Sequence, residues 1–278
     1  MGRWIVNFLI REGYHVIASD LNKEELLRLR SALPSLTIAE DNREAVIKAD
    51  IIVIAVPIES FEDVVKEIRH YVRERHLIMD ICSVKEEPVK IMHELIERGT
   101  KLGTHPLFGP GASTLKGKKV VLTPINLRER DVALRISKWL RAKGAQGLLM
   151  SPTEHDKYMR VVLGLTHFVG LSLIRELSEY ELSKLKELGG PTFNLMLTFA
   201  MAILAGNIEL YVSLQKHLNT YKVVKNLITN ENELLKRIEN EPEIVVQELL
   251  ELRRKLAEGN IDFNEAYKRM YRLFEENS

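Results

Sequence analysis

Apolar residues change their spacing about halfway along this chain. Before residue 151, short β-rich apolar runs alternate with segments of helical periodicity. The runs lie at residues 15–19, 51–56, 77–81, 119–123 and 147–150. The helical segments lie at residues 22–32, 60–74, 85–97 and 127–142. Runs that are apolar throughout are typical of parallel strands covered on both faces. The alternation therefore predicts an α/β fold with a doubly wound, Rossmann-type parallel sheet.

The second half of the chain has only helical patterns. Ser151 is placed to cap the first helix, with Pro152 in its first turn and Glu154 three residues after the cap. We therefore predict a dinucleotide-binding, Rossmann-like domain over residues 1–151 and an all-helical domain over 152–278.

Within the helical half, an apolar segment at residues 195–206 is too short to cross a bilayer, and we interpret it as a buried core helix. The charged tail from residue 231 onward is typical of solvated helical faces.

Composition narrows the possible partners. The chain has 278 residues with 40 basic and 39 acidic side chains, so its net charge of +1 gives no reason to expect nucleic acid or a membrane surface as a partner. The only cysteine, Cys82, excludes an internal disulfide and a CxxC metal or redox motif. With no secretory leader at its start, the chain is expected to be cytoplasmic.

Asp20 is the first candidate ligand-binding residue. It ends the run at 15–19 and follows Gly2 by 18 residues, close to the spacing at which a Rossmann acidic residue binds the ribose 2′-hydroxyl of NAD. A carboxylate there would repel the 2′-phosphate of NADP, so NAD is the expected cofactor. The alternative is that Asp20 only caps the helix that starts near Asn22.

The start of a Rossmann fold is incomplete in this sequence. Met1-Gly2-Arg3-Trp4 already lies in a helix, and the first strand and two glycines of GxGxxG are missing. A sheet without its central strand would leave backbone groups of the neighbouring strands unpaired, at roughly 1 to 3 kcal/mol for each buried group. We therefore hypothesise that the native start lies upstream and that Gly2 is the last glycine of the motif.

The segment from His105 to Gly111, HPLFGPG, places a histidine among prolines and glycines just beyond an expected strand. The prolines fix φ and the glycines allow a close approach to a ligand, so this loop is suited to hold one acid or base. An ordinary tight turn with an incidental histidine is the alternative.

Several segments in order resemble the prephenate dehydrogenase family, which oxidatively decarboxylates prephenate with NAD in tyrosine biosynthesis. The resemblance covers most of residues 1–220. Its parts are Met1-Gly2-Arg3-Trp4 with Gly13-Tyr14 and Asp20, Ala55-Val56-Pro57, Asp80-Ile81-Cys82-Ser83-Val84-Lys85, His105-Pro106-Leu107-Phe108-Gly109-Pro110, Glu154-His155-Asp156 and Leu165-Thr166-His167-Phe168.

The resemblance implies roles for these residues. His105 matches the catalytic histidine, which assists the C4 hydroxyl of the substrate, and Ser83 matches a serine between substrate, histidine and nicotinamide. His167 matches a histidine that faces the substrate. The implied cofactor-binding residues are Gly2, Arg3, Trp4, Asp20, Val56, Pro57 and Ser83. The resemblance also implies a homodimer formed through the helical domain. We expect no metal in the active site.

Other matched residues have less specific expectations. Lys85 is expected to cap or pair locally, and His155 and Asp156 are expected to be capping or interdomain residues outside the catalytic set. The arginine that many family members carry after the segment matching Pro191 is absent here. We expect Arg160 to bind the ring carboxylate of the substrate in place of that arginine, since it precedes His167 by seven residues, or two helical turns.

Alternative functions remain open from the sequence. Arogenate dehydrogenase uses the same chemistry on an aminated side chain. A hydroxyacid dehydrogenase of the 6-phosphogluconate type would instead use a catalytic lysine in the second domain. A non-catalytic, dimeric prephenate-binding relic is the alternative from another class, since the loop that holds the pyrophosphate is missing.

Overall fold

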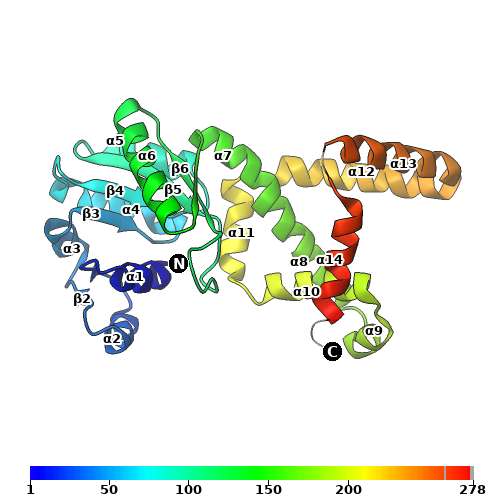
Figure 1. Cartoon of the computed structure of the whole chain (residues 1–278), viewed down its shortest axis with the longest axis horizontal. Coiled ribbons are helices and arrows are strands. Elements are labelled where there is room, and N and C mark those ends of the chain that lie inside the picture. Colours follow the sequence, from blue (N-terminus) through cyan, green and yellow to red (C-terminus); the bar gives the residue numbers. More distant parts are fainter. Residues whose placement is uncertain (260, 276–278) are drawn as a thin grey trace. The chain divides into compact units, whose positions relative to one another are not determined.

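The computed structural model describes residues 1–259 and 261–275. The chain divides into two compact units, Met1–Met159 and Arg160–Ser278 (Figure 1). The first unit extends beyond residue 151 because helix α7 (Pro152–Met159) packs against its helix α5 (Glu86–Leu95) and strand β6 (Lys119–Thr123).

The first unit contains two sheets. In one, β1 (Ile17–Ala18) pairs with β2 (Thr37–Ile38) in parallel. The other has the order β3-β4-β5-β6-β7, with the remaining strands at Ile51–Ile54 (β3), Leu77–Asp80 (β4), Thr100–Pro106 (β5) and Gln146–Leu149 (β7). All its neighbouring pairs are parallel except β5 and β6, which are antiparallel. The predicted Rossmann-type fold is confirmed, and in the described residues no strand joins β1 to β3.

Helices cover the sheets and are capped as their sequences favour. Besides α5 and α7, the first unit has α1 (Gly2–Arg11), α2 (Lys23–Ala32), α3 (Asn42–Lys48), α4 (Ile58–Ile68), the 3₁₀ turn η1 (Arg69–Tyr71) and α6 (Leu127–Ala142). The side chains of Asn22, Asp41 and Asn126 each accept a hydrogen bond from the backbone three residues on. A core of Leu102, Leu122 and Leu140 lies between the sheet and α6.

The second unit is helical, as predicted. It continues from α7 through the π-helix η2 (Arg160–Leu165) into α8 (Thr166–Leu177), followed by α9 (Leu182–Leu188), α10 (Pro191–Leu204), α11 (Ile208–His217), α12 (Tyr221–Asn240), α13 (Pro242–Glu258) and α14 (Phe263–Glu275). The predicted cap is present, since the backbone N–H of Glu154 donates to Ser151 Oγ at 3.1 Å.

The apolar segment predicted at 195–206 forms most of α10, which packs against α8. It buries Leu197, Ala200 and Ile203 and leaves Met201 and Leu204 exposed. By length and composition alone, the helix Pro152–Leu177 could cross a membrane, as could α10 and α11 if the bent pair formed one span.

The sequence pattern missed β2 and α3, and it gave no bounds for β5, the strand expected just before His105. Strand β5 does not form an apolar run in the sequence, because its buried residues include Thr100, Gly103 and Thr104. Their burial is compatible with the sheet because Thr104 Oγ1 donates to the carbonyl oxygen of Asp80 and Gly103 has no side chain to place. The carbonyl oxygen of Gly103 also accepts from Thr123 Oγ1.

Candidate active site

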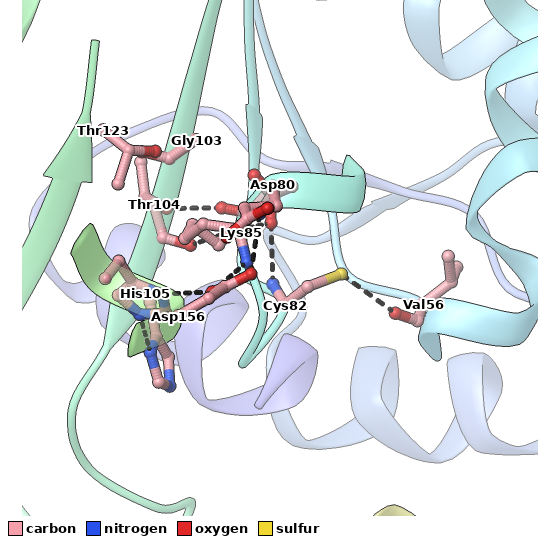
Figure 2. Close-up of polar contacts among 11 residues, drawn as sticks. Val56, Asp80, Cys82, Lys85, Gly103, Thr104, His105, Thr123 and Asp156 are labelled. Carbon is pink, nitrogen blue, oxygen red and sulfur yellow. Dashed lines mark hydrogen bonds and ion pairs between the residues drawn. The ribbon is translucent and has the colours of Figure 1, made fainter. Parts of the chain in front are cut away.

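A buried ion pair fixes the carboxyl end of β4. Asp80 is the last residue of this strand, and its Oδ1 binds Lys85 Nζ, with both side chains fully buried. Lys85 Nζ also donates to the carbonyl oxygen of Thr104 at 2.7 Å, and Asp80 Oδ1 accepts from the N–H of Cys82 at 2.9 Å. Figure 2 shows these groups together. The predicted local pairing of Lys85 is confirmed, and it ties the loop after β4 to β5.

His105 lies within β5 and not in a loop beyond it. The strand continues to Pro106, with His105 opposite Val121 of β6. The predicted stiff turn is therefore wrong for the histidine: the ladder between β5 and β6 holds its backbone. The glycines that follow, Gly109 and Gly111, have ordinary negative φ and no close neighbours.

A chain of hydrogen bonds leads from His105 into helix α7. His105 Nδ1 lies 2.8 Å from His155 Nε2, and His155 Nδ1 lies 2.6 Å from Asp156 Oδ1. All three side chains are buried. The other ring nitrogen of His105, Nε2, has no hydrogen-bond partner among the described residues and is not fully enclosed.

Burial decides the charge of His105. It lowers the pKa of this imidazole well below its usual value, and the neighbouring His155 and Lys85 act in the same direction. His105 is therefore neutral near pH 7 and can accept a proton at Nε2, as a general base must.

Asp156 caps a helix other than its own. Its Oδ1 accepts from the N–H of Lys85 at 2.8 Å and its Oδ2 from the N–H of Glu86 at 2.9 Å, at the first turn of α5. A carboxylate is stabilised there because the N–H groups at a helix N-terminus lack backbone partners. The capping expected of Asp156 is thus present, and it links α7 to the loop that carries Ser83.

Ser83 lies in the loop between β4 and α5 and is partly buried. Its hydroxyl has no hydrogen-bond partner among the residues that the structure describes, whereas Asp80 at the end of β4 and Lys85 in the same loop bind each other. The hydroxyl is therefore free to donate and accept. Burial raises the pKa of the thiol of Cys82 beside it, so this cysteine is no nucleophile.

Residues predicted to bind a dinucleotide lie at the N-terminus of α1 and at the carboxyl ends of β1 and β3. Gly2 lies beside Ala55, the residue after β3: a Cβ added to it would be 3.4 Å from Ala55 Cβ, an ordinary van der Waals distance. The first turn of α1 has no acidic residue, which suits an anion. Val56 and Pro57 follow β3, and Pro57 precedes the first residue of α4.

Asp20 is exposed in the loop after β1. Its Oδ1 accepts from the N–H of Asn22 at 2.8 Å, while Asn22 itself caps α2 by accepting from Glu25. The cap of α2 is therefore Asn22 and not Asp20, which instead forms a turn just before the helix. One carboxylate oxygen of Asp20 remains without a partner among the described residues.

The side chains of Trp4 and Arg3 make other contacts than the predicted cofactor contacts. The Trp4 ring packs against Phe8 and Phe108, and its Nε1 donates to the carbonyl oxygen of Ala112 at 2.6 Å. Trp4 therefore links α1 to the segment after β5, because its ring packs on Phe108 and its N–H finds a hydrogen-bond partner in the same segment. Arg3 pairs with Glu25 at 3.0 Å on the surface.

The two predicted substrate-binding residues of the second unit lie on either end of η2. His167 stacks on Tyr211, with ring centroids 4.0 Å apart, and its Nδ1 is buried without a hydrogen-bond partner. Burial lowers the pKa of this imidazole. Arg160 Nε donates to the carbonyl oxygen of Leu218 at 2.8 Å, and Arg160 makes no ion pair among the described residues.

The spacing argument for Arg160 assumed a regular α-helix. Residues 160–165 instead form a π-helix, whose i→i+5 hydrogen bonds give a wider turn. Seven residues therefore do not amount to two α-helical turns, and the structural reason for placing Arg160 and His167 on one face is wrong.

Sequence reasoning left His155 and Asp156 out of the catalytic set. The signal that could have found them is the pair of polar residues at the start of a predicted helix. If such side chains are buried, they need hydrogen-bond partners. Among the described residues, no group of three or more His, Cys, Asp or Glu side chains is arranged to hold a metal ion.

Two family models match nearly the whole chain. The prephenate dehydrogenase nucleotide-binding domain matches residues 6–147, and the prephenate dehydrogenase dimerization domain matches residues 151–275.

Curated relatives agree. The chain is 34% identical over 219 residues to a probable arogenate/prephenate dehydrogenase of Methanocaldococcus jannaschii, covering 77% of this chain and 49% of that protein. It is 31% identical over 172 residues to the T-protein of Haemophilus influenzae, covering 60% and 44%. The chain thus spans about half the length of these relatives.

Solved structures show the same fold. Prephenate dehydrogenase from Aquifex aeolicus, in complex with hydroxyphenyl propionate and NAD⁺, has a TM-score of 0.75 at 21% identity over 93% of this chain and 94% of that one. Arogenate dehydrogenase from Synechocystis has a TM-score of 0.72 at 18% identity, over 94% and 96%. With both domains matched in order, the chain belongs to the prephenate dehydrogenase family.

Proposed function

We propose that this protein oxidises and decarboxylates prephenate to 4-hydroxyphenylpyruvate with NAD, in the tyrosine branch of aromatic amino acid biosynthesis. The observation that carries the proposal is the state of His105. Its imidazole is buried and neutral, its Nδ1 is hydrogen-bonded to His155, and its Nε2 has no partner among the described residues. A base in that state is what removal of a hydroxyl proton requires. We also propose a cytoplasmic location, in keeping with the family's role in amino acid biosynthesis.

The residues of the first unit fit NAD where they are present. The N-terminus of α1 offers N–H groups without backbone partners to a pyrophosphate, and Gly2 lies there beside Ala55, just after β3. The exposed Asp20 would bind a ribose 2′-hydroxyl and repel a 2′-phosphate. When bound, NAD would supply the acceptor for the hydride that leaves C4 of the substrate.

The chain's own side chains would manage the proton. His105 Nε2 takes the proton of the C4 hydroxyl as that oxygen becomes carbonyl-like and returns it when loss of carbon dioxide makes the ring a phenol. Prephenate and NAD⁺ thereby give 4-hydroxyphenylpyruvate, carbon dioxide and NADH without a net proton. The free hydroxyl of Ser83 would orient the substrate oxygen. His167 and Arg160 are proposed as the substrate-binding groups of the second unit.

The test is reduction of NAD at 340 nm with prephenate and with arogenate, each also offered with NADP. Both substrates belong in the assay because a relative is named arogenate/prephenate dehydrogenase. We expect activity with NAD and prephenate, and a loss of about 10²- to 10⁴-fold in kcat for His105→Asn.

The exposed His70 in η1 provides a matched control, and His70→Asn should retain full activity. Calorimetry should show that His105→Asn still binds NAD, which separates loss of the base from loss of the fold. Full activity of His105→Asn would refute the assignment, and absence of NAD binding by the unaltered protein would support a non-catalytic role.

A further inference from the structure

The His105, His155 and Asp156 contacts form a continuous path whose two ends differ. At one end, Asp156 accepts hydrogen bonds from the backbone N–H groups of Lys85 and Glu86. Backbone N–H groups can only donate, so both carboxylate oxygens are acceptors. At the other end, the Nε2 atom of His105 has no partner among the described residues.

The Asp156 carboxylate fixes the direction of every hydrogen bond along the path. Because Asp156 Oδ1 accepts, His155 must donate from Nδ1, across 2.6 Å. A neutral imidazole with its proton on Nδ1 has a lone pair on Nε2. His155 Nε2 must therefore accept from His105 Nδ1, across 2.8 Å, which leaves the lone pair of His105 on Nε2.

We propose that His155 and Asp156 are positioning residues that hold His105 in the tautomer with its proton on Nδ1, so that Nε2 is the base. This inference rests on the proposed function for its catalytic consequence, but the tautomer itself is a property of the protein without ligands. The same logic operates where an aspartate orients a catalytic histidine in serine proteases, and there replacing the carboxylate with an amide lowers kcat about 10⁴-fold.

The path also stabilises the charge that forms during the reaction. When Nε2 of His105 gains the hydroxyl proton, an N–H bond forms as the O–H bond breaks. The Nδ1 proton then lies between two imidazoles, with the Asp156 carboxylate next along the path. The positive charge faces this carboxylate, which offsets part of the cost of burying it. When the product oxygen takes the proton back, the path returns to its first state.

The groups around His105 are few. His155 and Asp156 face it from α7, and Lys85, which is paired with Asp80 of β4, approaches from the segment before α5. Asp156 is the carboxylate of this path, and unlike Asp80 it is not paired with a lysine side chain.

Nitrogen-15 NMR of the imidazole side chains tests the tautomer directly. The chain has eight histidines, and the His105 signals are those absent from His105→Asn. In the unaltered, ligand-free protein near pH 7, we expect His105 to be protonated at Nδ1 and unprotonated at Nε2. A proton on Nε2 instead would overturn the proposal, and this measurement needs no folded variant of His155 or Asp156.

Asp156→Ala tests the control of direction. It removes the acceptor for His155 Nδ1, so no group fixes which nitrogen of His155 carries the proton, and His105 should show both tautomers. We expect this mixture with a fall in kcat of about 10²- to 10⁴-fold and little change in KM. Glu154→Ala makes the same truncation at an exposed carboxylate two residues earlier and should leave both the tautomer and kcat unchanged.

The possible outcomes separate the two proposals. An unchanged tautomer in folded Asp156→Ala would refute the control by Asp156, and mixed tautomers with unchanged kcat would refute its catalytic role. An unaltered protein that holds the expected tautomer but oxidises neither prephenate nor arogenate would refute the proposed function alone.

Discussion

Lys85 is the residue on which the geometry around β4 and β5 most depends. Without its ammonium group, Asp80 would be a fully buried carboxylate whose other oxygen, Oδ2, already has no hydrogen-bond partner. Breaking a buried ion pair by removing one member costs about 3–5 kcal/mol, whereas replacing both members is often nearly neutral.

We therefore predict that Lys85→Met lowers the stability of the first unit by about 3–5 kcal/mol at pH 7, and that Asp80→Asn together with Lys85→Met recovers much of it. Denaturant unfolding followed by tryptophan fluorescence measures this unit, because both tryptophans, Trp4 and Trp139, lie in it. Lys90→Met, at an exposed lysine of α5, should change stability by less than about 1 kcal/mol.

The pH dependence of Lys85→Met has a definite sign. Burial raises the pKa of Asp80, and Lys85 opposes that shift. In Lys85→Met the pKa of Asp80 is therefore raised further, because the lysine no longer opposes the effect of burial. The unfolded chain then releases its proton first, near pH 4, and stability falls as pH rises above that value. A destabilisation that is smaller at pH 7 than at pH 5 would contradict this account.

At the residue scale, the sequence predicted chemistry better than contacts. His105, Ser83 and Lys85 stand out because they lie in recognisable segments next to strands. The partners of His105 could not be predicted in this way, because 50 residues separate it from His155. Trp4 shows the same limit: its place in a segment expected to bind the nucleotide says nothing of Phe108, against which its ring packs.

At the scale of elements, the continuous helix from α7 to α8 depends on a glycine in its π-helical turn. Gly164 is buried in η2, and a Cβ there would come within 2.8 Å of Thr220 Cγ2 and closer still to its Oγ1. Thr220 is β-branched, so its side chain has little freedom to move away.

We predict that Gly164→Ala destabilises the second unit by about 1–3 kcal/mol, despite the better helix propensity of alanine. In a Thr220→Ala background the same change should cost less, with a coupling of about 0.5–3 kcal/mol. Hydrogen exchange of the amides in η2 and α12 measures both effects.

Gly170→Ala is the matched control. Its Cβ would clash with Cδ1 of Ile203, the flexible end of a side chain, while the next atoms, Cγ1 and Cβ of Ile203, would lie 3.3 and 3.4 Å away, so its cost should be lower. Equal costs for Gly164→Ala with and without Thr220 would show that the close contact is not the cause.

Elements with strong periodicity were predictable, and short or irregular ones were not. The apolar runs at β3, β4 and β6 and the amphipathic α6 appear close to their expected positions. The π-helical turn of η2 could not be predicted, because it depends on the contact of Gly164 with Thr220 and on Gln215 Nε2, which donates to the carbonyl oxygen of Gly164 at 3.1 Å. Both contacts join residues more than fifty positions apart.

At the scale of the whole molecule, the second unit carries more apolar surface than one copy can cover. Helices α12 and α13 pack against each other, yet each has a single buried residue, Val224 and Val245. The apolar residues they leave exposed are Ile228, Leu234, Leu235, Ile238, Ile244, Val246, Leu249, Leu250, Leu252 and Leu256. A surface of this kind marks an interaction site, and the matching family domain is a dimerization domain. We propose that a second copy of this chain covers it.

Light scattering should then give twice the chain mass of 32.0 kDa for the unaltered protein. Leu235→Glu and Leu249→Glu place charges on α12 and α13, and a two-fold dimer would bury each charge twice. Burying unpaired carboxylates costs several kcal/mol, so dimer affinity should fall by at least about 100-fold. Leu127→Glu, at an even more exposed leucine of the first unit, should leave the dimer intact. A monomeric unaltered protein, or a dimer unaffected by either change on α12 and α13, would show that this surface is not the contact between copies.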